Sequence, residues 1–267
     1  MTVSLCLTTF NRADQLDKGL QSLSHQTVMP DEIIMVDDGS CDHTKKVVDS
    51  WMNKLPIKYF NTGHPEHRIS SIPRNISIKK ATGDIILCSE SETLHPSTNI
   101  EKMLKKVTEK NFVIATNVWT MGEVFWNKMT QEQIDKPELL FGHPYAMLVS
   151  GNMQNTNAPN SDDSITGSNN CYVGIFFGIY KKHLLRVGGF DESFEGHGGD
   201  DWNLFDRLKL YGLKEIQTND ISVIHQWHRK DYPYNIYECA EKNLKKSRED
   251  IANGIYKPNQ GNDWGKL

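Results

Sequence analysis

Two adjacent carboxylates, Asp200 and Asp201, form the pair of residues in this sequence best suited to acid–base chemistry. Gly198 and Gly199 precede them, and a helix-like run from Trp202 to Tyr211 follows. Glycines allow a sharp turn and a close approach of the backbone to a ligand. A neighbouring negative charge tends to raise the pKa of a carboxyl group, as a general base requires. The same residues also suit an ordinary loop that ends in an acidic helix start.

A second acidic group, Glu90-Ser91-Glu92, follows the strand-like run 84–88, with Ser89 between them. Two carboxylates with one residue between them can face a hard cation. Magnesium or manganese held by one or two carboxylates and by substrate phosphates is the usual arrangement. His225 and His228 stand three residues apart further along the chain, and either could add a metal ligand, although a single histidine is more often an ordinary surface or core residue.

The pattern of strands and helices places Glu90 and Glu92 at one edge of a sheet. We expect strands at 3–9, 32–36, 57–60, 84–88 and 112–118, and helices at 13–26, 70–81 and 96–110 with another that ends at 51. This alternation predicts an α/β fold with a mostly parallel, doubly wound sheet, in which ligands bind beyond the carboxyl ends of the strands. Three polar clusters fall there: Thr8-Thr9-Phe10-Asn11-Arg12, Asp37-Asp38 and Glu90-Ser91-Glu92. Any one cluster is explained by turn chemistry, but three at one edge favour a binding site.

Two common nucleotide-binding motifs are absent from the sequence. There is no Gly-x-Gly-x-x-Gly after the first strand and no Walker A sequence, which disfavours a dinucleotide dehydrogenase or a P-loop enzyme. A nucleotide could bind by other means. Asp37 could accept a hydrogen bond from a base, and Phe10 could pack on its ring. Arg12, Arg68 or Arg74 could meet phosphates.

The overall composition excludes several other classes of protein. The 267 residues carry a net charge of −4 with a pI of about 6.2, which argues against nucleic-acid binding through bulk charge. The first residues lack the features of a signal peptide or a membrane span. The five cysteines are scattered without CxxC spacing, so we expect neither a disulfide framework nor a zinc site, and a cytoplasmic protein.

The second half of the chain is less regular. The segment 150–170 is rich in Asn, Ser, Asp and Gly, and its length indicates either a substrate lid or a loop with no role. We then expect a strand at 171–180, a short helix at 181–187, an edge strand at 215–224 and a helix at 237–251. The tail, 257–267, is expected to be loosely ordered.

Taken together, these segments resemble the family 2 glycosyltransferases with the GT-A fold. The similarity covers roughly 3–94 and 172–228. It rests on five segments: 3–12, 30–40, Arg74-Asn75 with 81–87, 188–192, and 198–201. The segment 30–40, Pro-Asp-Glu-Ile-Ile-Met-Val-Asp-Asp-Gly-Ser, is the most specific of them.

The resemblance implies a role for each matching residue. Asp37 would read the edge of uracil, and Asp201 would be the base that deprotonates the acceptor hydroxyl, with Asp200 beside it. Glu90 and Glu92 stand where the family has its Asp-x-Asp motif. The implied metal ligands are Glu92, His225 and Glu90, with His228 as the alternative histidine. The implied nucleotide- and substrate-binding residues are Thr8, Thr9, Phe10, Asn11, Arg12, Asp37, Asp38, Arg68, Arg74, Glu90, Ser91, Gly198, Gly199 and Trp202.

Two departures from the family pattern bear on activity. Glu-x-Glu in place of Asp-x-Asp moves each carboxylate out by one methylene, which would weaken metal binding or make activity less dependent on metal. His197 stands where many relatives carry Trp, which leaves the type of acceptor open.

The predicted function is therefore inverting transfer of a sugar from a nucleotide-diphosphate donor, most readily a UDP-sugar, to a hydroxyl of a glycan or lipid-linked acceptor, with Mn²⁺ or Mg²⁺. We expect 1–118 to form the nucleotide-sugar half of one domain, 119–228 the acceptor and catalytic half, and 229–267 a helical extension. Peripheral contact with a membrane fits a lipid-linked acceptor. The alternatives are a retaining GT-A enzyme, a sugar nucleotidyltransferase, which would normally carry a Gly-rich loop after the first strand, and a non-catalytic sugar-binding module.

Overall fold

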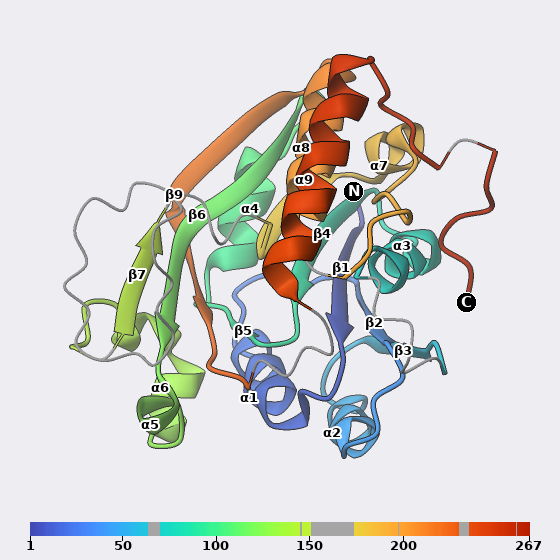
Figure 1. Ribbon diagram of the computed structural model, residues 1–267. Coiled ribbons are helices and arrows are strands. Elements are labelled where there is room, and N and C mark those ends of the chain that lie inside the picture. The colour runs from blue at the N-terminus through green and yellow to red at the C-terminus, as the bar shows by residue number, and fades with distance from the viewer. Residues whose placement is uncertain (64–69, 145, 151–173, 197, 230–234, 260) are drawn as a thin grey trace.

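A mixed β-sheet runs through the structure and carries helices on both faces (Figure 1). The computed structural model describes residues 1–63, 70–144, 146–150, 174–196, 198–229, 235–259 and 261–267, with the backbone alone for 147–150. The strands lie in the order β3-β2-β1-β4-β8-β6-β9-β5, and β7 pairs with β6 beside this path. Their bounds are β1 Val3–Thr9, β2 Glu32–Asp37, β3 Ile57–Asn61, β4 Ile85–Glu90, β5 Thr93–Leu94, β6 Asn111–Met121, β7 Ala146–Ser150, β8 Phe176–Tyr180 and β9 Lys214–His225.

Parallel pairing dominates the first half of the sheet. Strand β1 is parallel to β2 and β4, and β2 is parallel to β3. Strand β8 is antiparallel to both of its neighbours, β4 and β6, whereas β6 and β9 are parallel. The predicted α/β fold with a mostly parallel sheet is confirmed. The predicted edge strand at 215–224 is β9, which pairs with β6 along its length and meets the two-residue strand β5 only at Ile224 and His225. Among the described strands, β9 therefore has an open edge except at its last two residues.

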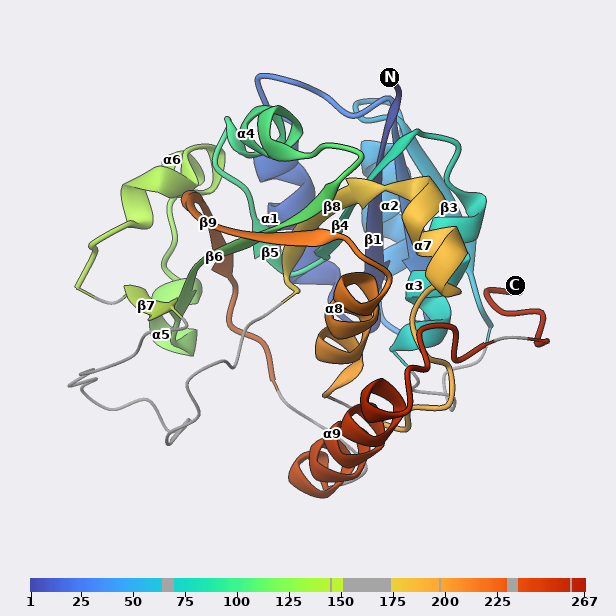
Figure 2. The same cartoon turned by 90° about the horizontal axis from the view of Figure 1, so that it is seen from above.

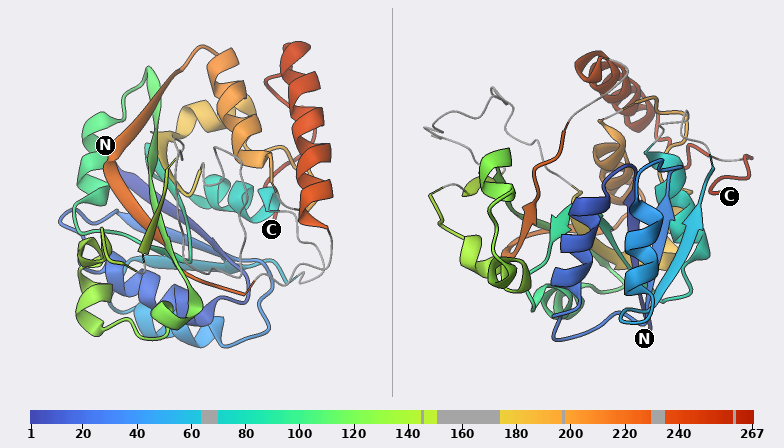
Figure 3. Two further views of the ribbon diagram at one scale, coloured as in Figure 1. Left: turned by 60° about the vertical axis from the view of Figure 1, so that its left-hand side comes forward. Right: turned by 90° about the horizontal axis from the view of Figure 1, so that it is seen from below.

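The helices form layers on the two faces of the sheet (Figure 2). One face carries α1 (Ala13–Leu23), α2 (Thr44–Trp51) and α4 (Asn99–Lys106), and the other carries α3 (Ser71–Lys80), α7 (Lys181–Val187) and α8 (Asp200–Leu210). Helix α9 (Ile236–Ala252) packs along α8 on the side away from the sheet (Figure 3). The short elements α5 (Glu123–Trp126), α6 (Gln131–Asp135) and η1 (Pro137–Leu140) follow β6.

Alternation along the strands builds a separate core on each face. In β1, Leu5 and Leu7 pack with residues of α1, α2 and α4, whereas Cys6 between them packs with residues of α3, α7 and α8. Successive side chains of a strand point to opposite faces, so an apolar run buried on both sides is typical of a central parallel strand. Burial of each large aliphatic side chain contributes about 1.5–3 kcal/mol, which holds the edge of the sheet, and the polar residues on it, in place.

The parallel register brings the predicted polar clusters to one edge. Thr9 of β1 pairs with Asp37 of β2, and Thr8 pairs with Glu90 of β4. The carboxyl ends of these three strands therefore meet, as the alternation of elements predicts. Among the residues that the structure describes, none of the helices combines the length and the apolar character needed to cross a membrane.

The tail is better fixed than its composition indicates. Asn259 is buried, and the backbone N–H of Gly265 donates to Glu192 Oε1 at 2.8 Å. The ammonium of Lys79 lies 4.1 Å from the centre of the Trp264 ring. The expectation of a loosely ordered tail is therefore wrong at Asn259, Trp264 and Gly265, because a buried amide, a cation–π contact and a backbone hydrogen bond hold these residues against the rest of the fold.

Candidate active site

One arginine joins the two acidic groups that stand far apart in the sequence. Arg74 of α3 donates from Nη1 to Asp200 Oδ2 and, at 3.2 Å, to Asp201 Oδ1. Its Nη2 donates to Glu90 Oε1 at 2.9 Å. A guanidinium presents several donors in a fixed plane, which suits it to hold carboxylates in a defined arrangement. The acids at 90, 200 and 201 therefore face one site.

The acidic pair opens α8, as the sequence predicts. Gly199 precedes the helix with φ of +87°, a conformation that glycine adopts readily. Asp200 also accepts from Ser70 Oγ at 2.8 Å. Burial raises the pKa of Asp201; Arg74 opposes this and Asp200 adds to it, and the resulting pKa is about 7. A carboxyl group with such a pKa can take up a proton near neutral pH.

Gly174 lies against the candidate base. Its φ is +95°, and a Cβ atom at this position would lie 2.4 Å from Asp201 Cγ. Sequence reasoning did not select this residue. Its signal is a glycine inside an apolar strand-like run, which often marks a close approach of another group to the backbone.

The Glu-x-Glu pair splits between two sets of partners. While Oε1 of Glu90 faces Arg74, its Oε2 lies 3.8 Å from His225 Nε2. Burial and the charge of Glu92 raise the pKa of Glu90 to about 8 against the effect of Arg74. Glu92 Oε1 lies 3.6 Å from His228 Nε2. Burial alone would raise the pKa of Glu92, but His228 and His225 bring it below the usual value.

A compact group of possible metal ligands results. Ligand atoms of Glu92, His225 and His228 all lie within 4.8 Å of one another. One carboxylate oxygen and two imidazole nitrogens form a mixed donor set that suits a divalent transition metal, whereas magnesium prefers oxygen ligands. Of the two predicted cations the group therefore fits Mn²⁺ better than Mg²⁺, with His228 in the group and Glu90 bonded to Arg74. The predicted set of Glu92, His225 and Glu90 remains a prediction.

The backbone holds this group together across two strands. Thr93 of β5 pairs with His225 of β9, and Gln226 N donates to the Glu92 carbonyl at 2.9 Å. The Gln226 side chain is fully buried, accepts from Trp126 Nε1 at 2.9 Å and donates to the Gln15 carbonyl at 2.8 Å. Sequence reasoning missed Gln226 and Trp126, because their relationship depends on tertiary contacts alone.

The predicted nucleotide loop is tied to its neighbour through a strained residue. Asn11 has φ of +49°, its backbone N–H donates to Ser40 Oγ at 2.8 Å, and its Oδ1 accepts from Cys41 N at 2.8 Å. Asp37 is buried and accepts from Tyr59 Oη at 2.6 Å and from Ser40 N at 2.8 Å. Each carboxylate oxygen can accept more than one hydrogen bond, and the contact of Asp37 with a base remains a prediction.

Other predicted residues surround this loop. The Thr9 hydroxyl is buried and has no hydrogen-bond partner among the described residues. Arg12 Nη2 donates to the Arg229 carbonyl at 3.2 Å. Ser91 Oγ donates to Glu92 Oε2 at 2.8 Å, and Ser91 N donates to the Thr8 carbonyl at 3.3 Å.

The remaining candidates contact segments that flank the site. Asp38 Oδ1 accepts from Thr62 Oγ1 at 3.2 Å, and Phe10 is half-buried. Gly198 and Gly199 pack against α9, where added Cβ atoms would lie 3.0 Å from Ala240 Cβ and Asn243 Cβ. Trp202 is half-buried in α8. Arg68, His197 and the segment 151–173 lie outside the described residues.

Comparison with known proteins decides the family. A profile of glycosyl transferase family 2 matches residues 4–187. The chain belongs to glycosyltransferase family 2. A second profile, described as the N-terminal domain of galactosyltransferase, matches residues 161–235 of this glycosyltransferase. The predicted class of enzyme, a glycosyltransferase, is thus confirmed at the level of the family.

Two curated relatives illustrate how distant the similarities are. An uncharacterized glycosyltransferase of Bacillus subtilis, YfnE, is 24% identical over 301 residues, which cover 98% of this chain and 76% of that protein. The GalNAc(5)-diNAcBac-PP-undecaprenol beta-1,3-glucosyltransferase of Campylobacter jejuni is 24% identical over 231 residues, which cover 86% of this chain and 66% of that protein. This glycosyltransferase therefore spans about two thirds to three quarters of these two relatives.

Solved structures share the fold at low sequence identity. Staphylococcus aureus TarS 1–349, crystallised with UDP-GlcNAc, superposes with a TM-score of 0.64 at 15% identity, covering 95% of this chain and 66% of that chain. The mannosyltransferase PcManGT of Pyrobaculum calidifontis, crystallised with GDP-Man and Mn²⁺, gives a TM-score of 0.57 at 14% identity, covering 93% of this chain and 69% of that chain. The predicted GT-A fold is confirmed.

Proposed function

We propose that this chain is an inverting hexosyltransferase that moves a sugar from a UDP-sugar to a hydroxyl of a glycan or lipid-linked acceptor. One observation carries the proposal. Arg74 binds Asp201, the candidate base, with one nitrogen and Glu90 with the other, and Glu90 lies beside the group formed by Glu92, His225 and His228. A base and a set of metal ligands thus face the same site, as transfer from a nucleotide sugar requires.

Asp201 is the general base of the proposed reaction. Its carboxylate takes the proton of the acceptor hydroxyl, whose oxygen forms a bond to the anomeric carbon. The bond from that carbon to the diphosphate breaks on the opposite face, so the nucleoside diphosphate leaves and the configuration is inverted. The Arg74 guanidinium keeps Asp201 oriented by its hydrogen bond at 3.2 Å.

The chain also offers residues for the leaving group. Glu92, His225 and His228 would hold a divalent cation, and their two imidazole donors favour Mn²⁺ over Mg²⁺. Such a cation, when bound, neutralises negative charge that develops on the departing diphosphate. The charge of Arg12 lowers the pKa of Glu92 and thereby helps to keep that carboxylate ionised for metal binding.

The donor and acceptor classes rest on relatives. TarS 1–349 has been crystallised with UDP-GlcNAc, and the C. jejuni relative is named for a lipid-linked acceptor. We assign residues 1–118 to donor binding, 119–228 to acceptor binding and catalysis, and 229–267 to a C-terminal extension.

The test compares Asp201→Asn with Asp206→Asn. Both substitutions neutralise a carboxylate of α8, but Asp206 is paired with Lys209 on the outer surface of the protein. Loss of the base should lower kcat by roughly 10²-fold or more, with UDP binding preserved. Asp206→Asn should leave kcat within about twofold of wild type.

Two outcomes oppose the proposal. Proton NMR of the product that shows a retained anomer would support a retaining enzyme instead. Tight UDP binding by wild-type protein without turnover of any donor, with or without Mn²⁺, would support a binding module.

A further inference from the structure

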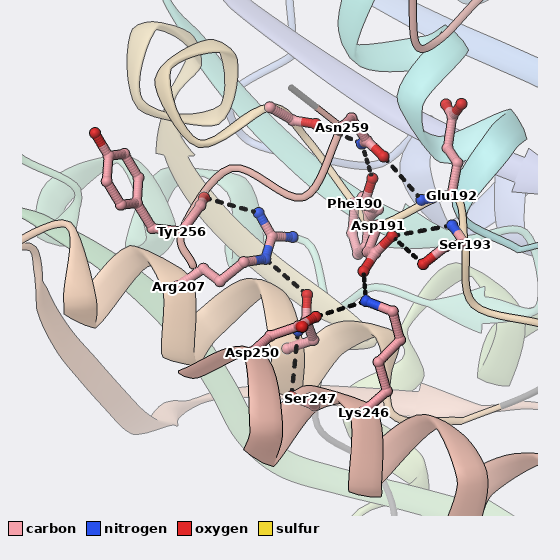
Figure 4. Close-up of polar contacts among 12 residues, drawn as sticks. Phe190, Asp191, Glu192, Ser193, Arg207, Lys246, Ser247, Asp250, Tyr256 and Asn259 are labelled. Carbon is pink, nitrogen blue, oxygen red and sulfur yellow. Dashed lines mark hydrogen bonds and ion pairs between the residues drawn. The ribbon is translucent and has the colours of Figure 1, made fainter. Parts of the chain in front are cut away.

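The loop that leads to the acidic pair is held by residues from the end of the chain (Figure 4). Asn259 Nδ2 donates to the carbonyls of Gly188 at 2.8 Å and Phe190 at 2.6 Å, and its Oδ1 accepts from Glu192 N at 3.2 Å. We call Gly188–Glu192 the 188–192 loop. One side chain, remote in sequence, thus satisfies three backbone groups of this loop.

A second asparagine holds the same loop from the side of α3. Asn75, which follows Arg74, donates to the Phe190 carbonyl at 2.9 Å and accepts from Phe190 N at 2.8 Å. It also donates to Glu192 Oε1 at 2.8 Å, which in turn accepts from Gly265 N. The Phe190 carbonyl therefore receives hydrogen bonds from both α3 and the end of the chain.

A buried arginine ties α8 into this arrangement. Arg207, which is fully buried, donates to the carbonyls of Val187 at 2.9 Å, Gly189 at 2.7 Å and Tyr256 at 3.4 Å. Burial lowers the pKa of Arg207 to about 10. Burying a charged group is costly unless its donors are satisfied, so these bonds fix α8, the loop and the end of the chain to one another. Figure 4 shows that Asp191 reaches Lys246 of α9 beside it.

The loop is also in contact with the candidate active site. The Arg74 guanidinium carbon lies 5.2 Å from the centre of the Phe190 ring, within the range of a cation–π interaction. A continuous set of contacts therefore runs from Asn259 to Phe190, from Phe190 to Arg74, and from Arg74 to Asp201 and Glu90.

We propose that Asn259 is a positioning residue for sugar transfer. It fixes the backbone of Phe190, whose ring supports Arg74 and thereby sets the orientation of Asp201. The inference rests on the proposed function, and it assigns to the end of the chain a role in transfer beyond holding the fold.

The experiment compares Asn259→Ala with Asn262→Ala. The two substitutions remove the same amide from the same segment, but Asn259 is buried and Asn262 is exposed. Because small misplacements at a reacting centre cost up to about 10²-fold in rate, we expect Asn259→Ala to lower kcat at least tenfold. The KM for the UDP-sugar and the Kd for UDP should stay within about twofold, since the residue touches neither the nucleotide loop nor the metal ligands. Asn262→Ala should match wild type.

The rates are measured well below the melting temperature of each variant. If Asn259→Ala does not fold, Gly265→Ala takes its place, because its Cβ would lie 2.8 Å from the Asn75 carbonyl and would displace the end of the chain. This variant should lower kcat in the same selective way.

The results also separate the two proposals. The positioning role alone is overturned if Asn259→Ala, or Gly265→Ala in its place, has the same kcat as Asn262→Ala. It is also overturned if the loss of kcat is matched by an equal loss of UDP affinity. A wild-type protein that transfers no sugar overturns the proposed function. In that case the positioning role is tested by amide hydrogen exchange of residues 188–192. Exchange that is no faster in Asn259→Ala than in Asn262→Ala overturns the positioning role as well.

Discussion

The backbone of Gly174 occupies the space beside the Asp201 carboxylate that a side chain would need. A Cβ at residue 174 would lie 2.4 Å from Asp201 Cγ, and φ at this glycine is +95°. Gly174→Ala should therefore displace Asp201 and lower kcat by about 10²-fold. The control is Gly142→Ala, which imposes a similar backbone strain at φ of +74° but meets no atom within 4 Å. Similar rates for the two variants would show that Asp201 tolerates displacement.

Acid–base titration of Asp201 should control the rate. Its pKa of about 7, raised mainly by burial, means that the carboxylate is protonated in most molecules below that pH. A general base must be ionised, so kcat/KM should rise tenfold per pH unit below about 7 and level off above it. Because the charge of Asp200 raises the pKa of Asp201, Asp200→Asn should shift the rise of kcat/KM to lower pH. If kcat/KM of the wild-type enzyme instead rises near pH 4, Asp201 is not the base.

Metal binding should depend on His228. Manganese that binds the folded protein raises its melting temperature, with about 2.7 kcal/mol of stabilisation at a hundred times the Kd. His228→Ala should remove most of this shift, whereas His43→Ala, at a surface histidine paired with Asp14, should retain it. If Glu90→Gln abolishes the shift and His228→Ala does not, the Glu-x-Glu pair binds the metal instead.

A buried carboxylate outside the site should make stability depend on pH. Burial would raise the pKa of Glu32, but hydrogen bonds from Lys58, Ser4 and Thr82 lower it to about 2. A lowered folded-state pKa gives stability that is present above about 4.5 and is lost as the pH falls toward 2. Glu32→Gln should therefore lower the free energy of unfolding by about 1–3 kcal/mol at pH 7. Urea denaturation at pH 7 and pH 2.5 tests this, and a difference that persists at the lower pH contradicts it.

Local sequence patterns predicted the elements that form the site edge. Apolar runs such as Val3–Thr9 and Glu32–Asp37 appear as β1 and β2, and the polar residues that end them meet because parallel strands end together. The start of α8 at Asp200 was predictable from the glycines before it. These features depend on neighbours in the sequence.

Contacts between side chains that lie far apart in the sequence could not be predicted from local patterns. Arg74 suited a phosphate ligand from its charge alone, yet it binds three carboxylates because α3 faces the start of α8. The contacts of Asn259 and Gly174 likewise depend on which segments pack together. Polar composition at the end of the chain does not reveal that one of its asparagines becomes buried.

The position of β8 has a consequence for how this protein can be divided. Strand β8 joins β4 to β6, although residues 176–180 follow both strands in the sequence. A fragment that stops at residue 118 would contain every residue assigned to the donor half but would lack both β8 and β9, so β4 would lose one neighbour and β6 would lose its neighbours on both sides. Exposed edges of this kind recruit other chains, so such a fragment should aggregate during expression, and complementation would require a second fragment that supplies both β8 and β9.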